Sequence, residues 1–108
     1  MSKLYMGFDA GTQSVKVAVY DEQFNCLTSH SLPTHLHYPQ PGCVEMSADE
    51  FLEITVKSMA ACAQSLREMG RDPKDVCAVM GDGIICGIVG VNPDGDAVTH
   101  YINYLDSR

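Results

Sequence analysis

Three apolar stretches near the start of the chain alternate with polar turns, in the pattern of a small antiparallel sheet. Residues 4–9 and 15–21 are predicted strands on either side of a short turn, and residues 26–32 are a third predicted strand that ends before Pro33. Residues 21–25 supply the turn between the second strand and the third. The pattern therefore predicts a three-stranded antiparallel meander.

A single long helix is predicted at residues 47–69. Ser47 and Glu50 have the spacing of a capping box, in which each side chain bonds the backbone N–H of the other residue. Gly70 stands where a helix commonly ends. Apolar residues recur every three or four positions, which predicts one buried stripe. The stripe comprises Leu52, Val56, Met59, Ala63, Leu66 and Met69.

The segments around this helix complete the predicted topology. Residues 33–46 contain three prolines and a glycine, so an ordered loop is expected. After the polar residues 71–75, the apolar run 76–80 is typical of a strand covered on both faces, as in a parallel sheet with a crossover helix. Residues 88–91 and 97–99 are further predicted extended segments. The order predicts an α/β fold whose mixed sheet joins the meander to a parallel strand.

Composition and charge limit the classes of partner. The 108 residues fit one small domain, and 45% hydrophobic with 19% charged residues is ordinary for globular protein. A net charge of -7 argues against nucleic acid or an anionic membrane as partner. It does not argue against ATP, because a backbone turn with Mg²⁺ binds phosphate without a basic patch. No signal-peptide pattern or membrane-length apolar run is found, so a cytoplasmic protein is expected.

Cysteine and histidine spacing gives no metal site. The five cysteines include no Cys-x-x-Cys pair, so we expect reduced thiols that are mostly small core residues. His35 and His37 lie two residues apart without a nearby third ligand. We therefore expect both histidines on the surface of a loop.

The candidate chemistry is concentrated in residues 7–17. Asp9 ends the first predicted strand, and a turn with glycine, threonine and serine follows. Backbone N–H groups and hydroxyls in such a turn can hold phosphate oxygens, and the carboxylate can hold a hydrated divalent cation. The spacing is neither that of a Walker-type loop nor that of a dinucleotide fingerprint. The alternative is that Asp9 caps a tight turn while Thr12 and Ser14 bond their own backbone.

The order Gly-x-Asp-x-Gly-Thr-x-Ser at residues 7–14, between two strands, resembles the first phosphate motif of the actin-like ATPase superfamily. It is most similar to the FGGY carbohydrate kinases, the xylulokinase and glycerol kinase group. Residues 41–45 resemble the family's Pro-Gly-Trp-Val-Glu segment, with Cys43 in place of tryptophan, and residues 104–108 resemble its Trp-x-Asp-x-Arg segment. The resemblance implies a ribonuclease-H-like mixed sheet. It places residues 1–108 in the N-terminal kinase domain, carrying the sugar side and the first phosphate motif without the second domain.

The resemblance also implies roles for single residues. Asp9 would contact Mg²⁺ through water, and the positions after it would cradle the phosphates of ATP. Ile85 and Cys86 fall where relatives usually offer more polar groups to the sugar, and the alternative is that both pack under the sheet edge. Asp106 and Arg108 would lie at the polar edge of the sugar site, or form a surface ion pair. The implied phosphate-binding residues are Gly11, Thr12, Gln13, Ser14 and Lys16, and the implied substrate-binding residues are Ile85, Cys86, Tyr104, Asp106 and Arg108.

The activity implied by the resemblance is that of a carbohydrate kinase, a phosphotransferase with an alcohol group as acceptor. It would move the γ-phosphoryl of ATP to a hydroxyl of a pentulose or related polyol. In the family the catalytic base and the adenine site come later in the chain, so residues 1–108 alone are expected to be inactive. Two alternatives are a non-catalytic actin-like nucleotide-binding module and a free-standing regulatory domain. An exposed sheet face would also allow a homo-oligomer.

Overall fold

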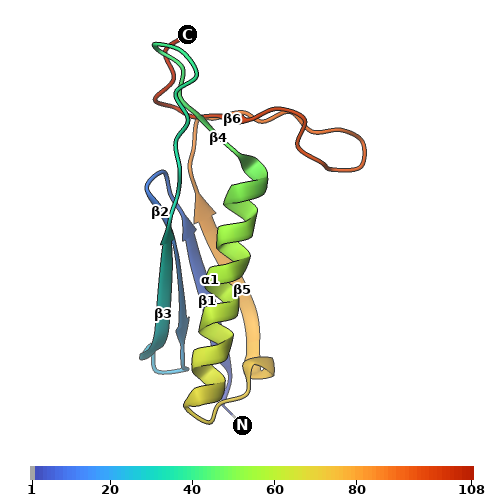
Figure 1. Cartoon of the computed structure of the whole chain (residues 1–108). Helices are drawn as coiled ribbons and strands as arrows, with labels where there is room; N and C mark the ends of the chain where they lie inside the picture. The colour runs from blue at the N-terminus through green and yellow to red at the C-terminus, as the bar shows by residue number, and fades with distance from the viewer. Residues whose placement is uncertain (1) are drawn as a thin grey trace.

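The structure, a computed structural model that describes residues 2–108, contains a four-stranded sheet with one long helix on one face (Figure 1). The strands are β1 (Leu4–Ala10), β2 (Ser14–Tyr20), β3 (Cys26–Pro33) and β5 (Val76–Gly83), in the spatial order β3-β2-β1-β5. β1, β2 and β3 pair antiparallel, whereas β5 pairs parallel to β1. The predicted meander and the predicted parallel strand are both confirmed.

Helix α1 (Ala48–Glu68) and the short 3-10 helix η1 (Pro73–Asp75) connect the meander to β5. Ser47 is the N-cap, since its side chain accepts a hydrogen bond from the Glu50 N–H at 3.2 Å. The return half of the predicted capping box does not form, because the Glu50 carboxylate contacts His35 instead. Gly70 follows the helix with φ +78, a left-handed conformation that favours glycine. The predicted helix ends are therefore confirmed.

The buried stripe of α1 differs from the predicted one. The helix residues that are buried are Thr55, Ser58, Cys62 and Leu66, and the last two join Leu4, Val15, Val17 and Val19 in the hydrophobic core. Leu52 and Val56 are 65% and 54% exposed. They line an apolar cavity of about 500 Å³ with residues from the ends of β1 and β5. The reason is the placement of α1, which packs over β2 and β3, so that the Leu52 side of the helix meets no strand.

The strand β5 forms one edge of the sheet. It is exposed over residues 77–83, with Val79 at 53% and Met80 at 80% exposure. The expected cover on both faces of this strand is therefore not found among residues 2–108. The cysteine expectation was also mostly wrong, because only Cys62 is buried, while Cys26, Cys77 and Cys86 are exposed. All five thiols are free, as expected.

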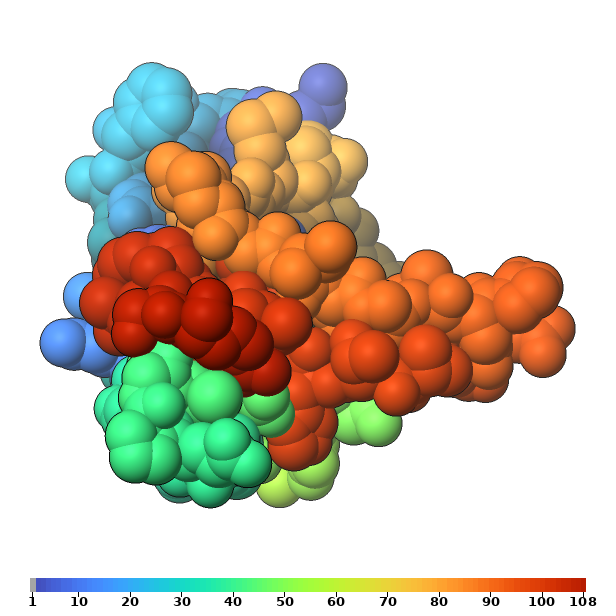
Figure 2. Space-filling view, turned by 90° about the horizontal axis from the view of Figure 1, so that it is seen from above, coloured from blue at the N-terminus to red at the C-terminus, as the bar shows by residue number. Residues whose placement is uncertain are grey.

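A small antiparallel sheet of β4 (Glu45–Met46) and β6 (Tyr101–Ile102) lies at the end of the molecule toward which β1 and β5 point (Figure 1). The predicted strands at 88–91 and 97–99 do not form. They make only isolated pairings, Ile88 with Ile102 and Val91 with Ala97, and belong to an arm that projects sideways (Figure 2). Within the described residues, the arm pairs with the small sheet only where Ile88 pairs with Ile102 of β6, and this pairing extends no further. Among residues 2–108, α1 is too polar to qualify as a membrane-crossing helix.

Candidate functional site

The turn between β1 and β2 is fixed by its own bonds and by the residue that follows β3. The Gly11 N–H donates to the Ser14 carbonyl at 3.0 Å and closes the turn. Thr34 bonds two carbonyls inside the turn. Its hydroxyl donates to the Thr12 carbonyl, and its backbone N–H donates to the Gln13 carbonyl. Within residues 2–108, no acceptor takes the N–H groups of Thr12 and Gln13. Two backbone donors of the turn are therefore unpaired, as a phosphate-binding turn requires.

Asp9 lies beside this turn at the end of β1 and is exposed. A Cβ added at Gly11 would lie 3.2 Å from the Ser14 carbonyl oxygen and 3.9 Å from Asp9 Oδ1, so the carboxylate borders the turn closely. Carboxylate oxygens suit Mg²⁺, which keeps several of its waters and prefers oxygen ligands. The donors of the turn and the Asp9 carboxylate together fit a magnesium-bound phosphate group. The alternative in which Asp9 caps the turn is not supported, because none of the backbone N–H groups of residues 2–108 that bond a side chain donates to Asp9.

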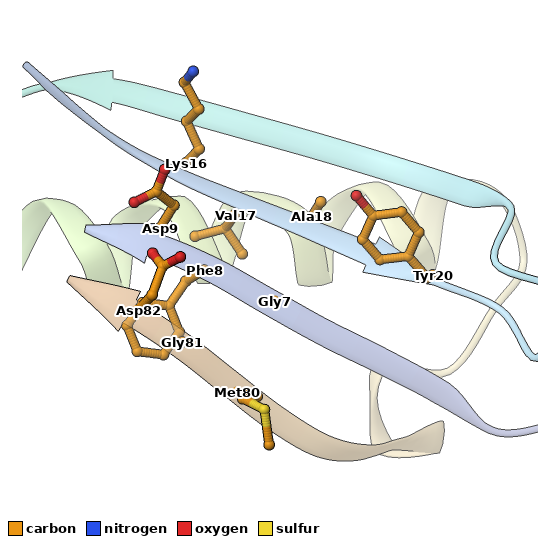
Figure 3. Close-up of a pocket in the computed structure, with 10 residues that line it drawn as sticks. All are labelled: Gly7, Phe8, Asp9, Lys16, Val17, Ala18, Tyr20, Met80, Gly81 and Asp82. Atoms are coloured by element: carbon orange, nitrogen blue, oxygen red, sulfur yellow. The ribbon is translucent and has the colours of Figure 1, made fainter. Parts of the chain in front are cut away.

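Two charged residues face Asp9 from the neighbouring strands, Lys16 from β2 and Asp82 from β5. All three line a cavity of about 420 Å³ on the sheet face opposite α1 (Figure 3). Gly7 and Ala18 form part of its floor. A hydrogen bond to Asp9 and the negative charge of Asp9 raise the pKa of the Asp82 carboxyl. Asp82 was not among the site residues predicted from the sequence.

The Ile85 and Cys86 segment follows β5 and is exposed. Ile85 is 77% exposed, and Cys86 is exposed with φ 62, a left-handed conformation that is uncommon outside glycine. The next residue, Gly87, packs closely on Tyr101, since an added Cβ would lie 1.9 Å from the tyrosine hydroxyl oxygen. The segment is thus held against β6 with Ile85 and Cys86 directed outward. The alternative in which both pack under the sheet edge is wrong.

The C-terminal residues form a bonded group of charges. The Asp106 side chain is only 4% exposed and accepts from the Val44 N–H at 2.7 Å. The Arg108 guanidinium donates to Asp106 at 2.7 Å and to Glu45 at 2.6 Å, and His100 Nδ1 lies 3.0 Å from the second Glu45 oxygen. Arg108 lowers the pKa of both carboxyls, and for Asp106 it does so strongly. Asp106 is mostly buried whereas Arg108 is 43% exposed, so the ion pair lies at the surface as part of a network with Glu45 and His100.

Asp106 and Arg108 lie together as predicted, and the structure adds Glu45 to them. Glu45 is the last residue of the 41–45 segment that resembles a family motif, so the sequence did point to it. Its contact with Arg108 was not predictable, because the two residues lie 63 positions apart in the chain. Tyr104 is 53% exposed beside this group. The turn after β1 and the end of β5 lie below the small sheet in Figure 1, and the chain runs from β6 to the C-terminus beyond them at the end of the molecule. The predicted phosphate turn and the predicted sugar-side residues therefore lie in the same half of the fold, at successive positions along its long axis.

Residues 4–107 match the N-terminal domain of the FGGY family of carbohydrate kinases. A curated relative, the xylulose kinase of Staphylococcus epidermidis, is 29% identical over 108 residues, which are 100% of this chain and 21% of the relative. A solved structure of xylulose kinase from Rhodospirillum rubrum matches with a TM-score of 0.85 at 19% identity, over 98% of this chain and 22% of that one.

A structure of Plasmodium falciparum glycerol kinase with ADP matches with a TM-score of 0.77 at 21% identity, over 99% of this chain and 21% of that chain. These likenesses confirm the predicted fold, an α/β domain in which a mixed sheet joins an antiparallel meander to a parallel strand through a crossover helix. The chain spans about a fifth of the length of the relatives that it matches.

Proposed function

Because the chain belongs to the FGGY family of carbohydrate kinases, we propose that it carries the first phosphate motif and part of the sugar side of an ATP-dependent sugar kinase. The complete enzyme transfers the γ-phosphoryl of ATP to a hydroxyl of a pentulose or related polyol. Relatives named xylulose kinase and glycerol kinase support this class of acceptor. The glycerol kinase structure with ADP supports an adenine nucleotide as the phosphate source.

The observation that carries this proposal is the exposed Asp9 carboxylate beside a turn whose Thr12 and Gln13 N–H groups have no acceptor among residues 2–108. In phosphoryl transfer the protein mainly positions groups and offsets negative charge. Asp9 would hold Mg²⁺, and the bound ion would supply charge neutralisation at the phosphates. Lys16 lies opposite Asp9 on β2 and adds a positive charge at the same cavity. The residues that cradle the phosphates are Gly11, Thr12, Gln13 and Ser14.

On the sugar side, Arg108 and Tyr104 are the exposed groups that contact the substrate. Asp106 and Glu45 hold the guanidinium from two directions, so Arg108 offers its remaining donors in a fixed orientation. Asp106 thus acts chiefly by orienting Arg108. Ile85 and Cys86 present an apolar edge, which favours a substrate whose nearest part carries few hydroxyls.

The catalytic base and the adenine site belong to parts of the complete protein outside residues 1–108. The relatives are about five times longer than the matched part, which leaves room for a second domain. A kinase cleft needs both walls to exclude water during transfer. Residues 1–108 alone are therefore inactive.

Calorimetric titration of the complete protein with MgADP, followed by thermal-shift assays with pentuloses and polyols, tests this proposal. We expect MgADP binding that Asp9→Asn weakens, and stabilisation by at least one pentulose or polyol. Asp94→Asn, on the projecting arm, is the matched control and leaves both results unchanged. Nucleotide binding without stabilisation by any sugar or polyol would favour the nucleotide-binding module. No nucleotide binding would refute the proposal.

A further inference from the structure

Two carboxylates lie side by side at the ends of neighbouring strands. β1 and β5 run parallel, and their register places Asp9 directly opposite Asp82. Both side chains are exposed and lie on the open face of the sheet, where they line the same cavity (Figure 3). The pair is thus fixed by the backbone of two sheet strands rather than by a loop.

This pair is unfavourable by itself. Like charges directly opposite each other on a sheet destabilise it. Among residues 2–108, neither carboxylate has a lysine or arginine nitrogen within 4.0 Å, although Lys16 lies opposite Asp9 on β2. Figure 3 shows the Lys16 amine directed away from the space between the two carboxylates. Two changes relieve such a pair: a proton held between the carboxyls, which is the hydrogen bond that raises the pKa of Asp82, or a cation that both carboxylates approach.

The register that aligns the two carboxylates is held by a close contact one residue earlier. Phe8 lies opposite Gly81, and a Cβ at Gly81 would lie 2.1 Å from the Phe8 ring. The ring therefore occupies the space that any other residue at position 81 would fill. A slip of β5 by one residue would place a side chain against the ring. The pairing of Phe8 with Gly81 thus favours the register that sets Asp82 beside Asp9.

We propose that Asp82 is the second carboxylate of the magnesium site, and that it positions the ion together with Asp9 in front of the phosphate turn. Mg²⁺ in phosphate sites is bound by one or two carboxylates, waters and phosphate oxygens, and this arrangement supplies the two carboxylates. Asp82 then sets where the ion lies between β1 and β5. The inference depends on the proposed function, because it assigns a further residue to the same site.

The test is Mn²⁺ binding to the complete protein, followed by the electron paramagnetic resonance signal of the free ion, without nucleotide. We expect Asp82→Asn to weaken Mn²⁺ binding by about tenfold or more, and Asp9→Asn to weaken it at least as much. Asp94→Asn is the control and leaves binding unchanged. The melting temperature of the metal-free Asp82→Asn protein should not fall, because the substitution removes a like-charge neighbour. If the role of Asp82 were purely structural, Asp82→Asn would leave Mn²⁺ binding unchanged and would lower the melting temperature of the metal-free protein.

The outcomes separate this inference from the proposed function. If Asp9→Asn abolishes Mn²⁺ and MgADP binding while Asp82→Asn binds Mn²⁺ as the parent does, only the role of Asp82 is overturned. If the parent protein binds neither Mn²⁺ nor MgADP, both proposals fail. If Asp82→Asn lowers the melting temperature of the metal-free protein and leaves the Mn²⁺ affinity unchanged, Asp82 is structural.

Discussion

Truncating two leucines of α1 to alanine should have very different effects on stability, although both belong to the apolar stripe predicted from the sequence. Leu66 is 0% exposed and packs in the core with the strand valines. Leu52 is 65% exposed and borders the apolar cavity. The chemical change is the same in both variants and both sites lie on one helix. Burial is therefore the variable that the comparison isolates.

The magnitude follows from the two exposures. A buried Leu→Ala change loses transfer free energy and leaves a cavity, so Leu66→Ala should cost about 3 kcal/mol. Only about a third of the Leu52 surface is removed from water, which gives a loss of roughly 0.5–1 kcal/mol, partly offset by the higher helix propensity of alanine. For a domain of this size, 1 kcal/mol shifts the melting temperature by about 4–8 °C. Leu66→Ala should thus lower it by more than about 10 °C, and Leu52→Ala by only a few degrees.

Urea unfolding followed by circular dichroism measures both free energies of unfolding, and a thermal melt provides a second reading. The slope of the free energy against urea should stay constant, because neither change alters the surface exposed on unfolding very much. Equal losses at the two positions would refute the assignment of the buried face. A larger loss at Leu52 would mean that the face of α1 that borders the apolar cavity is the face covered in solution.

Three further changes have expected outcomes. Gly81→Ala should cost about 1–3 kcal/mol in urea unfolding, because the added methyl group meets the Phe8 ring. Ser47→Ala should cost about 1 kcal/mol in the same assay, because it removes the N-cap of α1. Arg108 holds the pKa of Asp106 below its usual 3.8. The stabilisation that the charged Asp106 contributes is therefore complete above that value and is lost as pH falls through the lowered pKa. Asp106→Asn should flatten this acid dependence of the free energy of unfolding.

Each change also has an outcome that would contradict it. A Gly81→Ala protein as stable as its parent would show that the Phe8 ring moves aside without cost. Unchanged stability of Ser47→Ala would mean that water replaces the cap. If Asp106→Asn leaves the acid limb of the stability curve as steep as before, other carboxyl groups dominate it.

The local parts of the fold were predictable from the sequence. Alternating apolar residues and turn residues identified β1, β2 and β3, and the apolar run at 76–80 identified β5, because these signals lie within short stretches of chain. Ser47 and Gly70 marked the helix ends for the same reason. The buried stripe of α1 was not predictable, because it depends on which strands the helix crosses. The exposed cysteines likewise depend on the edge position of β5 and on the loops around it.

The candidate site was predictable where one motif carries it. The turn with Asp9 could be read from seven or eight consecutive residues, and its backbone geometry agrees with a phosphate-binding turn. The place of Asp82 beside Asp9 could not be found in this way, because it comes from the parallel register of β5 with β1. Glu45 was visible in its segment, but its bond to Arg108 joins residues far apart in sequence. Long-range pairing is the information that the local pattern lacks.

The edge position of β5 has a consequence for how the protein behaves in solution. β5 bonds to β1 on one side only, and its outer row of backbone groups has no ladder partner among residues 2–108. A net charge of -7 repels copies of the chain from one another while ionic strength is low. At about 1 M salt the screening length falls to about 3 Å, so this repulsion is lost and an exposed apolar edge becomes free to pair. Light scattering should therefore show self-association that grows with added salt, and low-salt buffers are the conditions that keep the chain monodisperse.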